Sequence, residues 1–417
     1  MIMLILAVGS YGDVLPLVGL GRELRTRGHD VTLISNSHFA NLVQQAGLNF
    51  VELGSTEEYD DLVNNPSLWH PHKGWRLIMK RLVSGALEDA YNLLKSKVIQ
   101  RNTMLISSTL GFAARLIQET HHLPLATIHC SPGVFHSAHQ PPKVPGLPLP
   151  DWLPVAFTQN VWKLLDHTMI DPIVKSKLNR FRSQLGLPPV SRIFHDWLHS
   201  PDLVLGLFPE WFAAPQSDWP PQTRVTGFPL FDEAHDSSLP SEVQDFLEQG
   251  SPPLVFTPGS AMKHGRRFFS EAARACQLSD HCGIFLTRYP EQLPPSLPKK
   301  VKHFSYVPLS RLLPHAAALI HHGGIGTCSQ ALRAGIPQVI QPMAFDQFDN
   351  AARVKKLEVG TMVPKRSFRA PIIAQRLQGL LNSTNAKTQC ERIKNHFQGR
   401  DPLRESCHLI ETTISRA

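Results

Sequence analysis

Several signatures that would assign the chain to common functional classes are missing. The six cysteines form no CxxC pair, the 21 histidines form no HExxH, and the CQLSDHC spacing at 276–282 does not fit a zinc site. We therefore expect reduced thiols, a cytoplasmic protein and no bound metal. Gly9 and Gly12 do not make GxGxxG, so a dinucleotide-binding fingerprint is missing as well.

Long apolar runs, repeats and low-complexity tracts are also missing. No apolar segment reaches the roughly 20 residues of a transmembrane helix, and the opening MIMLILAV lacks the basic flank of a signal peptide. We expect a soluble protein that begins with a buried strand. The net charge of +8 indicates attraction to nucleotides, nucleic acid or an anionic membrane. Because the Lys and Arg residues are scattered and no RNP-like motif is present, nucleic acid is not an expected partner.

What the chain does contain is an alternation of short apolar runs and amphipathic segments in both halves. Strands are predicted at 1–8, 31–35, 103–108, 125–130, 203–208, 253–257, 283–287, 301–306, 317–320 and 338–340, with helical patterns between them. This alternation predicts α/β domains with parallel sheets. A chain of 417 residues exceeds what one core usually supports, so we expect two domains.

Proline-rich and polar segments interrupt this alternation. Prolines crowd residues 131–154 and 209–221, where we expect loops, the first of which could shape an acceptor site. The polar segment 229–242 is the best candidate for a hinge between domains.

The densest functional pattern lies in residues 317–350. An apolar run is followed by HHGGIGT and a helical segment at 328–334, so the turn offers N–H groups and a helix dipole to a phosphate. His322 and Thr327 can add hydrogen-bond donors, while Gly324 and Gly326 let the backbone approach a ligand. The pattern can also be only a turn. Asp346 and Gln347, beyond the next strand, suit adjacent sugar hydroxyls and favour a ligand site.

Two further segments of the second half carry candidate ligand contacts. Ser260, in the turn TPGSAMKHG, can reach a phosphate from another side. Tyr306 and Val307 lie on a turn stiffened by Pro308, where an aromatic ring can stack on a nucleotide base. Buried packing explains Tyr306 equally well.

Asp13 follows the first predicted strand, in the turn GSYGDVLP. Directly before an amphipathic run, it is a good helix N-cap. At the carboxyl end of a parallel strand, it can instead take a proton from an acceptor hydroxyl. The residues by themselves favour the cap and leave both roles open.

Residues 69–83 combine an apolar face with a basic border that includes Lys73, Arg76, Lys80 and Arg81. An amphipathic packing helix is the favoured interpretation. A lining for an apolar acceptor and contact with a membrane surface are the alternatives.

Taken together, these features resemble the GT-B glycosyltransferases. GSYGDVLP is similar to the opening of bacterial members of the family that contains UDP-glycosyltransferases and antibiotic-modifying glycosyltransferases, and residues 306–350 correspond to its donor-binding box. The resemblance implies two Rossmann-like domains facing each other across a cleft. Residues 1–222 would bind the acceptor and 223–395 the nucleotide-sugar donor, while a helix in 396–417 would pack back on the first domain.

Within that family, the segment FPEWFAAPQSDWP at 208–220 is similar to the rhamnosyltransferases of rhamnolipid synthesis. This resemblance implies transfer of L-rhamnose from dTDP-L-rhamnose to a lipid-like acceptor, a 3-(3-hydroxyalkanoyloxy)alkanoate. It also implies a cytoplasmic enzyme with peripheral contact to the inner membrane or to an acyl-supplying partner enzyme.

The resemblance assigns roles residue by residue. Donor contacts are expected from Ser260, His322, Gly324, Gly326 and Thr327 (phosphates), Asp346 and Gln347 (sugar), and Tyr306 and Val307 (base). Asp13 stands where plant members carry a catalytic histidine, which favours its role as base in an inverting reaction that uses no metal or cofactor. Leu309 stands where plant members carry a glutamine, so the donor sugar stays open.

Three alternatives remain. The first is a glucosyltransferase acting on a sterol, carotenoid or macrolide. The second is a nucleotide-sugar epimerase of the same two-domain fold, and the third is a non-catalytic nucleotide-sugar-binding subunit. Asp13 in the first turn and the donor box argue against the last two.

Overall fold

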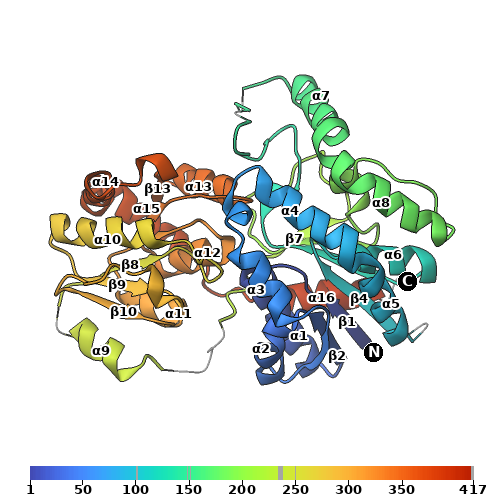
Figure 1. The fold of residues 1–417 in the computed structure, drawn as a ribbon, viewed down its shortest axis with the longest axis horizontal. Helices are drawn as coiled ribbons and strands as arrows, with labels where there is room; N and C mark the ends of the chain where they lie inside the picture. The colour runs from blue at the N-terminus through green and yellow to red at the C-terminus, as the bar shows by residue number, and fades with distance from the viewer. Residues whose placement is uncertain (100–101, 148, 151, 233–237, 249, 415–417) are drawn as a thin grey trace. The chain divides into compact units, whose positions relative to one another are not determined.

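The computed structural model describes residues 1–417 except 100–101, 148, 151, 233–237, 249 and 415–417. The chain divides into two compact units, Met1–Phe231 with Asp401–Ala417, and Asp232–Arg400 (Figure 1). Within the described residues, no helix has the length and apolar character needed to cross a membrane. Each unit is organised around its own parallel sheet.

The sheet of the first unit has seven strands in the described part of the chain, all paired in parallel. Their order is β3 (Asn49–Glu52), β2 (Asp30–Ser35), β1 (Ile2–Leu6), β4 (Thr103–Ser108), β5 (Leu125–His129), β6 (Leu203–Gly206) and β7 (Thr223–Val225). Every residue of β4 and β5 is buried, as expected for strands covered on both faces. The edge strand β3 is partly exposed and was not predicted from its polar sequence.

Helices cover this sheet. They are α1 (Tyr11–Thr26), α2 (Ala40–Gln45), α3 (Thr56–Asn64), α4 (Lys73–Arg81), α5 (Leu87–Lys97), α6 (Phe112–His121), α7 (Val155–Leu165), α8 (Asp171–Gln184) and α16 (Pro402–Ile414). Short 3-10 turns lie at Ser37–Phe39, Pro66–Trp69 and Pro132–Val134, and π-helical turns at Leu82–Ala86, Asp166–Ile170 and Ile193–Trp197. The last helix of the chain, α16, packs on α1 in this unit (Figure 1).

The sheet of the second unit has six strands in the described residues, again all parallel. Their order is β10 (Val301–Phe304), β9 (Gly283–Leu286), β8 (Leu254–Thr257), β11 (Ala318–His321), β12 (Gln338–Ile340) and β13 (Gly360–Met362). Helices and 3-10 turns connect them: α9 (Ser241–Glu248), α10 (Arg266–Ser279), Pro290–Gln292, α11 (Leu309–Leu312), Leu313–His315, α12 (Ile325–Ala334), α13 (Gln347–Lys356), Lys365–Ser367, α14 (Ala370–Asn382) and α15 (Thr384–Asn395).

The junctions between the units lie later in the chain than the expected boundaries at 222/223 and 395/396. Strand β7 pairs with β6 in the first sheet, and residues 223–231 all belong to the first unit and not to the second. The expected hinge at 229–242 contains residues 233–237, which lie outside the described residues. At its start, Asp232 accepts hydrogen bonds from Gln330 Nε2 (2.9 Å) and Ser310 N (3.2 Å). These bonds attach Asp232 to α12 and α11 of the second unit.

The apolar side of α4 packs on the core. Met79 is buried, and Ile78 packs against the same core cluster. The Trp75 ring meets Phe194 edge-on at 4.7 Å. The favoured interpretation of residues 69–83 as a packing helix therefore agrees with the contacts, and the outer side of α4 is basic.

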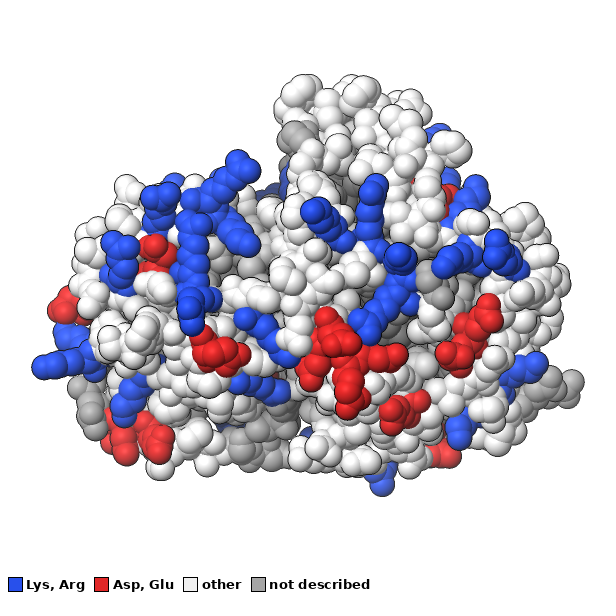
Figure 2. All heavy atoms as spheres, viewed as in Figure 1, with Lys and Arg blue, Asp and Glu red and all other residues white. Residues whose placement is uncertain are grey.

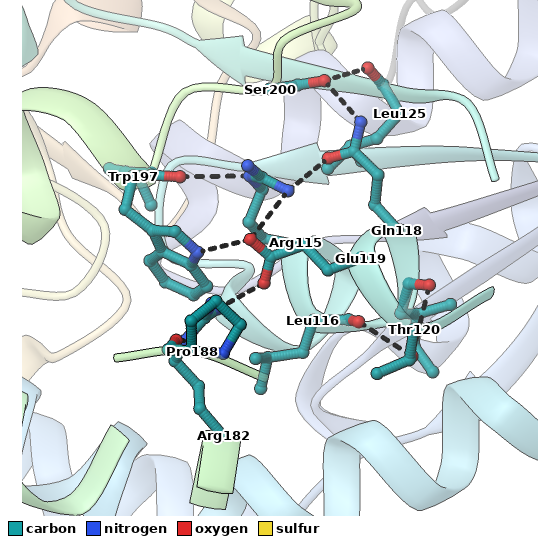
Figure 3. A network of polar contacts seen from close by, with 12 residues as sticks. Arg115, Leu116, Gln118, Glu119, Thr120, Leu125, Arg182, Pro188, Trp197 and Ser200 are labelled. Atoms are coloured by element: carbon teal, nitrogen blue, oxygen red, sulfur yellow. Dashed lines mark hydrogen bonds and ion pairs between the residues drawn. The ribbon is translucent and has the colours of Figure 1, made fainter. Parts of the chain in front are cut away.

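A polar network joins α6, α8 and the π-helical turn Ile193–Trp197 (Figure 3). Glu119 pairs with Arg182 and accepts a hydrogen bond from Trp197 Nε1 (3.1 Å). Arg115 Nε donates to Trp197 O (3.1 Å), and Arg182 Nε donates to Pro188 O (2.8 Å). Because Arg182 is buried, removing its partner would leave an unpaired charge in the core.

Candidate active site

Asp13 lies in the first turn of α1, the helix that follows the interior strand β1. The N-cap is Ser10, so Asp13 is not the cap that its sequence position suggested; it is the acidic member of a capping box. Its Oδ2 accepts hydrogen bonds from Ser10 N (2.9 Å) and Ser10 Oγ (3.2 Å). Its Oδ1 accepts no hydrogen bond from the residues that the structure describes.

The turn holds the Asp13 carboxylate against the backbone of Gly9. A Cβ at Gly9 would lie 2.3 Å from Asp13 Oδ2. Gly9 also has a φ of +141°, which residues other than glycine rarely adopt. Burial raises the pKa of Asp13, and the two hydrogen bonds from Ser10 partly oppose that rise. A carboxylate with a raised pKa is a stronger base than an ordinary aspartate.

In the second unit, three neighbouring strands place three turns at one edge of the sheet. Strands β8, β11 and β12 are adjacent and parallel, with Thr257 and Ile340 both in register with His321. Their carboxyl ends lead into the turn at Ser260, the HHGGIGT turn and the loop before Asp346. Open α/β sheets bind ligands at this edge.

The side chain of His321 holds the HHGGIGT turn in place by hydrogen bonds. It is buried, its Nε2 lies 3.0 Å from Gln338 Oε1, and its Nδ1 accepts a hydrogen bond from Gly323 N (3.1 Å). Burial lowers its pKa to about 3, so the ring is neutral and donates from Nε2. No role for His321 was predicted from the sequence.

The His322 ring lies between two glycines from different turns. A Cβ at Gly324 would lie 2.5 Å from His322 Nε2, and one at Gly259 would lie 2.8 Å from Cε1. Burial lowers the pKa of His322 to about 4. Its buried Nδ1 has no hydrogen-bond partner within the described structure, so this ring nitrogen can serve a ligand.

The helix that follows begins earlier than predicted, at Ile325 instead of Cys328. Gly324 is its N-cap, which places Gly326 and Thr327 in the first turn, where N–H groups have no partner within the helix. Gly326 is exposed, and apart from its chain neighbours and the adjacent backbone of its own helix, no described residue lies within 4 Å of the position of its missing Cβ. Together with the dipole of α12, this turn forms a site suited to an anion.

Ser260 and Thr327 both lie close to this edge. Ser260 is exposed and Thr327 partly exposed. Neither hydroxyl makes a hydrogen bond to the part of the chain that the structure describes. Both are available as additional donors to an anion.

The Asp346-Gln347 pair lies at the start of α13, after Phe345, whose φ of +56° is unusual for a side chain of this size. Gln347 is buried, and its Oε1 accepts hydrogen bonds from Met343 N (2.8 Å) and Ala344 N (3.2 Å). The carbonyl half of its amide thus shapes the loop. Only its Nε2 remains for a ligand.

Asn350 connects this pair to the glycine-rich turn. Its Nδ2 donates to Asp346 Oδ2 (2.8 Å) and to Gly323 O (3.0 Å), and the residue is fully buried. Asn350 was not predicted to belong to the site. Its spacing of four residues from Asp346 on a helix was the available signal.

Tyr306 and Val307 have different environments. Val307 is buried, whereas the Tyr306 ring is about one-third exposed at 37%. The guanidinium carbon of Arg288 lies 5.5 Å from the Tyr306 ring centre, a cation–π arrangement that the sequence did not suggest.

The two proline-rich loops of the first unit pack on each other. Phe135 stacks on Trp219 at 4.2 Å, and Ser137 Oγ donates to Asp218 Oδ1 (2.8 Å). Residues 148 and 151 of the first loop lie outside the described residues. The acceptor role of this loop stays a prediction.

The absence of a bound metal also stays a prediction. Within the described residues, no group of three or more His, Cys, Asp or Glu side chains could hold a metal ion.

Two protein-family models match the chain. Residues 3–139 match the model of the glycosyltransferase family 28 N-terminal domain. Residues 284–405 match the model of the C-terminal domain of proteins like erythromycin biosynthesis protein CIII. The first match includes the turn at Asp13. The second includes the HHGGIGT turn and the Asp346-Gln347 pair.

Three named relatives resemble the chain along nearly its full length. 4'-Demethylrebeccamycin synthase of Lentzea aerocolonigenes is 25% identical over 97% of both chains. O-mycaminosyltylonolide 6-deoxyallosyltransferase of Streptomyces fradiae is 27% identical over 98% of this chain and 96% of the relative. Sterol 3-beta-glucosyltransferase of Saccharomyces cerevisiae is 26% identical over 99% of this chain but only 35% of the longer relative.

Solved structures resemble the chain along nearly its full length. The kitacinnamycin glycosyltransferase has a TM-score of 0.76 at 18% identity, and a spinosyn rhamnosyltransferase complexed with thymidine diphosphate has a TM-score of 0.70 at 16% identity. Each match covers 99% of both chains. The fold is therefore GT-B, which confirms the predicted fold class. The chain is a glycosyltransferase, as its relatives and the family model of its first domain indicate.

Proposed function

We propose that the chain transfers a deoxysugar, L-rhamnose, from dTDP-L-rhamnose to a hydroxyl of a lipid-like acceptor, with inversion at the anomeric carbon. The observation that carries the mechanism is the asymmetry of the Asp13 carboxylate. Oδ2 is held by Ser10, while Oδ1 is left to accept a proton. The 208–220 resemblance supports the sugar and the acceptor, a 3-(3-hydroxyalkanoyloxy)alkanoate. The rhamnosyltransferase named among the structural neighbours was solved with thymidine diphosphate, which supports the donor.

In the proposed reaction, Asp13 Oδ1 takes the proton of the acceptor hydroxyl while that oxygen attacks the anomeric carbon. The bond from this carbon to the diphosphate oxygen breaks, and the electron pair leaves with the diphosphate. The N-terminal turn of α12, His322, Thr327 and Ser260 stabilise the leaving group by hydrogen bonds. Because His322 is neutral, it contributes an N–H donor and not a positive charge.

The Asp13→Asn variant tests the role of the base. It keeps the shape of the side chain but cannot accept the proton, so we expect turnover to fall roughly a hundredfold or more with little change in donor binding. Steady-state kinetics and donor titration measure the two quantities. Turnover similar to the wild type would remove Asp13 from the mechanism.

A thermal-shift and turnover screen tests the substrates. We expect dTDP-L-rhamnose to stabilise the protein more than UDP-glucose does, and a hydroxyacyl lipid to accept the sugar. A larger shift with UDP-glucose would reject the rhamnosyl assignment.

A second candidate is glycosylation of a polycyclic or macrolide natural product. The names of the Lentzea, Streptomyces and yeast relatives favour it. Turnover of a macrolide or sterol, without turnover of hydroxyacyl lipids, would select this candidate.

A further inference from the structure

The helix α7, the turn before it and the π-helical turn after it expose large apolar side chains that no described residue covers. Trp152 is 79% exposed, Phe157 54%, Leu164 62% and Met169 49%. These four residues, here called the α7 ridge, come from one stretch of 18 residues at 152–169. Single exposed apolar side chains are ordinary, but four along one stretch need an explanation.

The ridge is a regular feature of the helix. Phe157 and Leu164 are seven residues apart, which places them on one side of α7. The neighbouring side of the same helix is buried through Thr158, Trp162 and Asp166. The helix therefore has a core-facing side and a separate apolar side that faces outward.

The exposed charges within residues 152–184 have one sign, and the neighbouring acid Asp196 is paired with Arg192 (3.2 Å). Over residues 152–184, the exposed charged side chains are Lys163, Lys177 and Arg180, with Lys175 partly exposed. The two acidic residues of this range, Asp166 and Asp171, are buried. Residues 152–184, here called the arm, therefore present apolar and positively charged groups to their surroundings.

The basic character extends to α4, which packs on α8. Residues 66–86 contain no Asp or Glu, and Lys73, Arg76 and Lys80 are exposed. In Figure 2 the surface over α7 is mostly uncharged, and Lys and Arg gather over α4 below it. Most acidic side chains of this view lie in its lower half, farther from α7, and a small acidic group lies among Lys and Arg on the right flank of the upper part.

The arm is attached firmly to its unit. The Trp162 indole donates to Ser137 O (3.1 Å), and the Asp171 carboxylate accepts from Arg192 N (2.8 Å) and Ile193 N (3.0 Å). At the far end of α8, Arg182 belongs to the network of Figure 3. The ridge is thus held in one orientation.

We propose that the α7 ridge docks this enzyme on an anionic lipid surface. The apolar side chains enter the interface between headgroups and acyl chains, and the Lys and Arg residues of α7, α8 and α4 contact the negatively charged headgroups. Charge complementarity selects an anionic membrane over a neutral one. The inference uses neither the sugar nor the acceptor proposed above, so it can fail or succeed independently of them.

Sedimentation of the full-length chain with lipid vesicles tests the proposal. We expect binding to vesicles of phosphatidylcholine and phosphatidylglycerol in equal parts, and about tenfold weaker binding to phosphatidylcholine alone. Binding to the anionic vesicles falls as salt rises from 0.1 to 0.5 M, taken as rough test concentrations. A double variant, Phe157→Ser with Leu164→Ser, lowers the binding at least about tenfold.

A matched control is available in the second unit. Leu278 on α10 is 61% exposed, as exposed as Leu164, but lies outside the arm. We expect Leu278→Ser to bind vesicles like the wild type, and circular dichroism to show all variants folded. Equal binding to both vesicle types, loss of binding in Leu278→Ser, or no binding to either vesicle would overturn the proposal. Dimerisation that the double variant abolishes would also overturn it, since the ridge would then bind a second copy.

Discussion

The two oxygens of the Asp13 carboxylate have different surroundings. Oδ2 accepts hydrogen bonds from the backbone N–H and the hydroxyl of Ser10. These two bonds fix the Asp13 side chain in one rotamer against Gly9. Oδ1 carries the proposed chemistry. The cap and base interpretations of Asp13 therefore do not compete, because each uses a different atom.

Gly326 and Gly379 form a matched pair for testing the anion site. Both glycines lie in helices, and apart from the adjacent backbone of its own helix neither has a described residue within 4 Å of the missing Cβ, so an alanine fits at either position without a clash. We expect Gly326→Ala to raise the dissociation constant of the donor about tenfold, because the new methyl group occupies the space assigned to the diphosphate. Isothermal titration with the nucleotide-sugar measures this constant.

The Gly379→Ala variant supplies the control. It should bind donor like the wild type and gain up to about 1 kcal/mol of stability from helix propensity. Unchanged donor binding in Gly326→Ala would place the diphosphate elsewhere.

At the scale of the element, α16 returns to the first unit and is attached by two kinds of contact. Ile410 and Cys407 are fully buried. Glu411 pairs with Arg27 Nη1 (2.9 Å) and His29 Nε2 (3.0 Å) near the surface. Burial of apolar side chains stabilises more than partly exposed ion pairs, so the two contacts should respond differently to mutation.

We expect Ile410→Ala to lower the free energy of unfolding of the first unit by about 2–5 kcal/mol, and Glu411→Gln by less than about 1 kcal/mol. All seven tryptophans lie within residues 1–231, so tryptophan fluorescence during urea unfolding reports on this unit. If Glu411→Gln lowered the free energy of unfolding as much as Ile410→Ala does, the ion pairs and not apolar burial would be the main attachment of α16.

At the scale of the whole molecule, buried histidines make stability depend on pH. Burial lowers the pKa of His136 to about 3 and of His199 to about 4, and it lowers the pKa of His129 well below its usual range. Above pH 6.5, the pKa of a histidine in the unfolded chain, these rings are neutral in both states and the folded protein keeps its full stability. As pH falls below 6.5, the unfolded chain binds more protons than the folded protein, so the free energy of unfolding falls. Asp166 works in the opposite direction, because burial raises its pKa to about 6.

Three histidines outweigh the two aspartates of this unit whose pKa is raised by burial, Asp166 and Asp13, in this balance. We therefore expect the first unit to lose stability between pH 6.5 and 5, by up to about 1.4 kcal/mol per pH unit for each histidine. Urea unfolding followed by tryptophan fluorescence at the two pH values measures the change. An increase in stability at pH 5 would show that these histidines do not remain neutral in the folded protein.

Local pattern was enough to predict most elements. Strand β4 was predicted with the observed bounds, and so was β12, because apolar runs between polar turns identify buried strands. The short polar strands β3 and β13 were not predicted. They form because a neighbouring strand offers hydrogen bonds, which is a tertiary contact and not a property of their residues.

The same division holds for the site. The sequence by itself determined that a glycine-rich turn precedes a helix, that an acidic-amide pair follows the next strand and that an aspartate follows the first strand. Only the tertiary structure decided that β8 lies beside β11, which brings Gly259 against the ring of His322 from more than sixty residues away (322 − 259 = 63). The physical reason is that parallel strands join residues distant in sequence, so partners such as Gly259 and His322 leave no periodic signal in the chain.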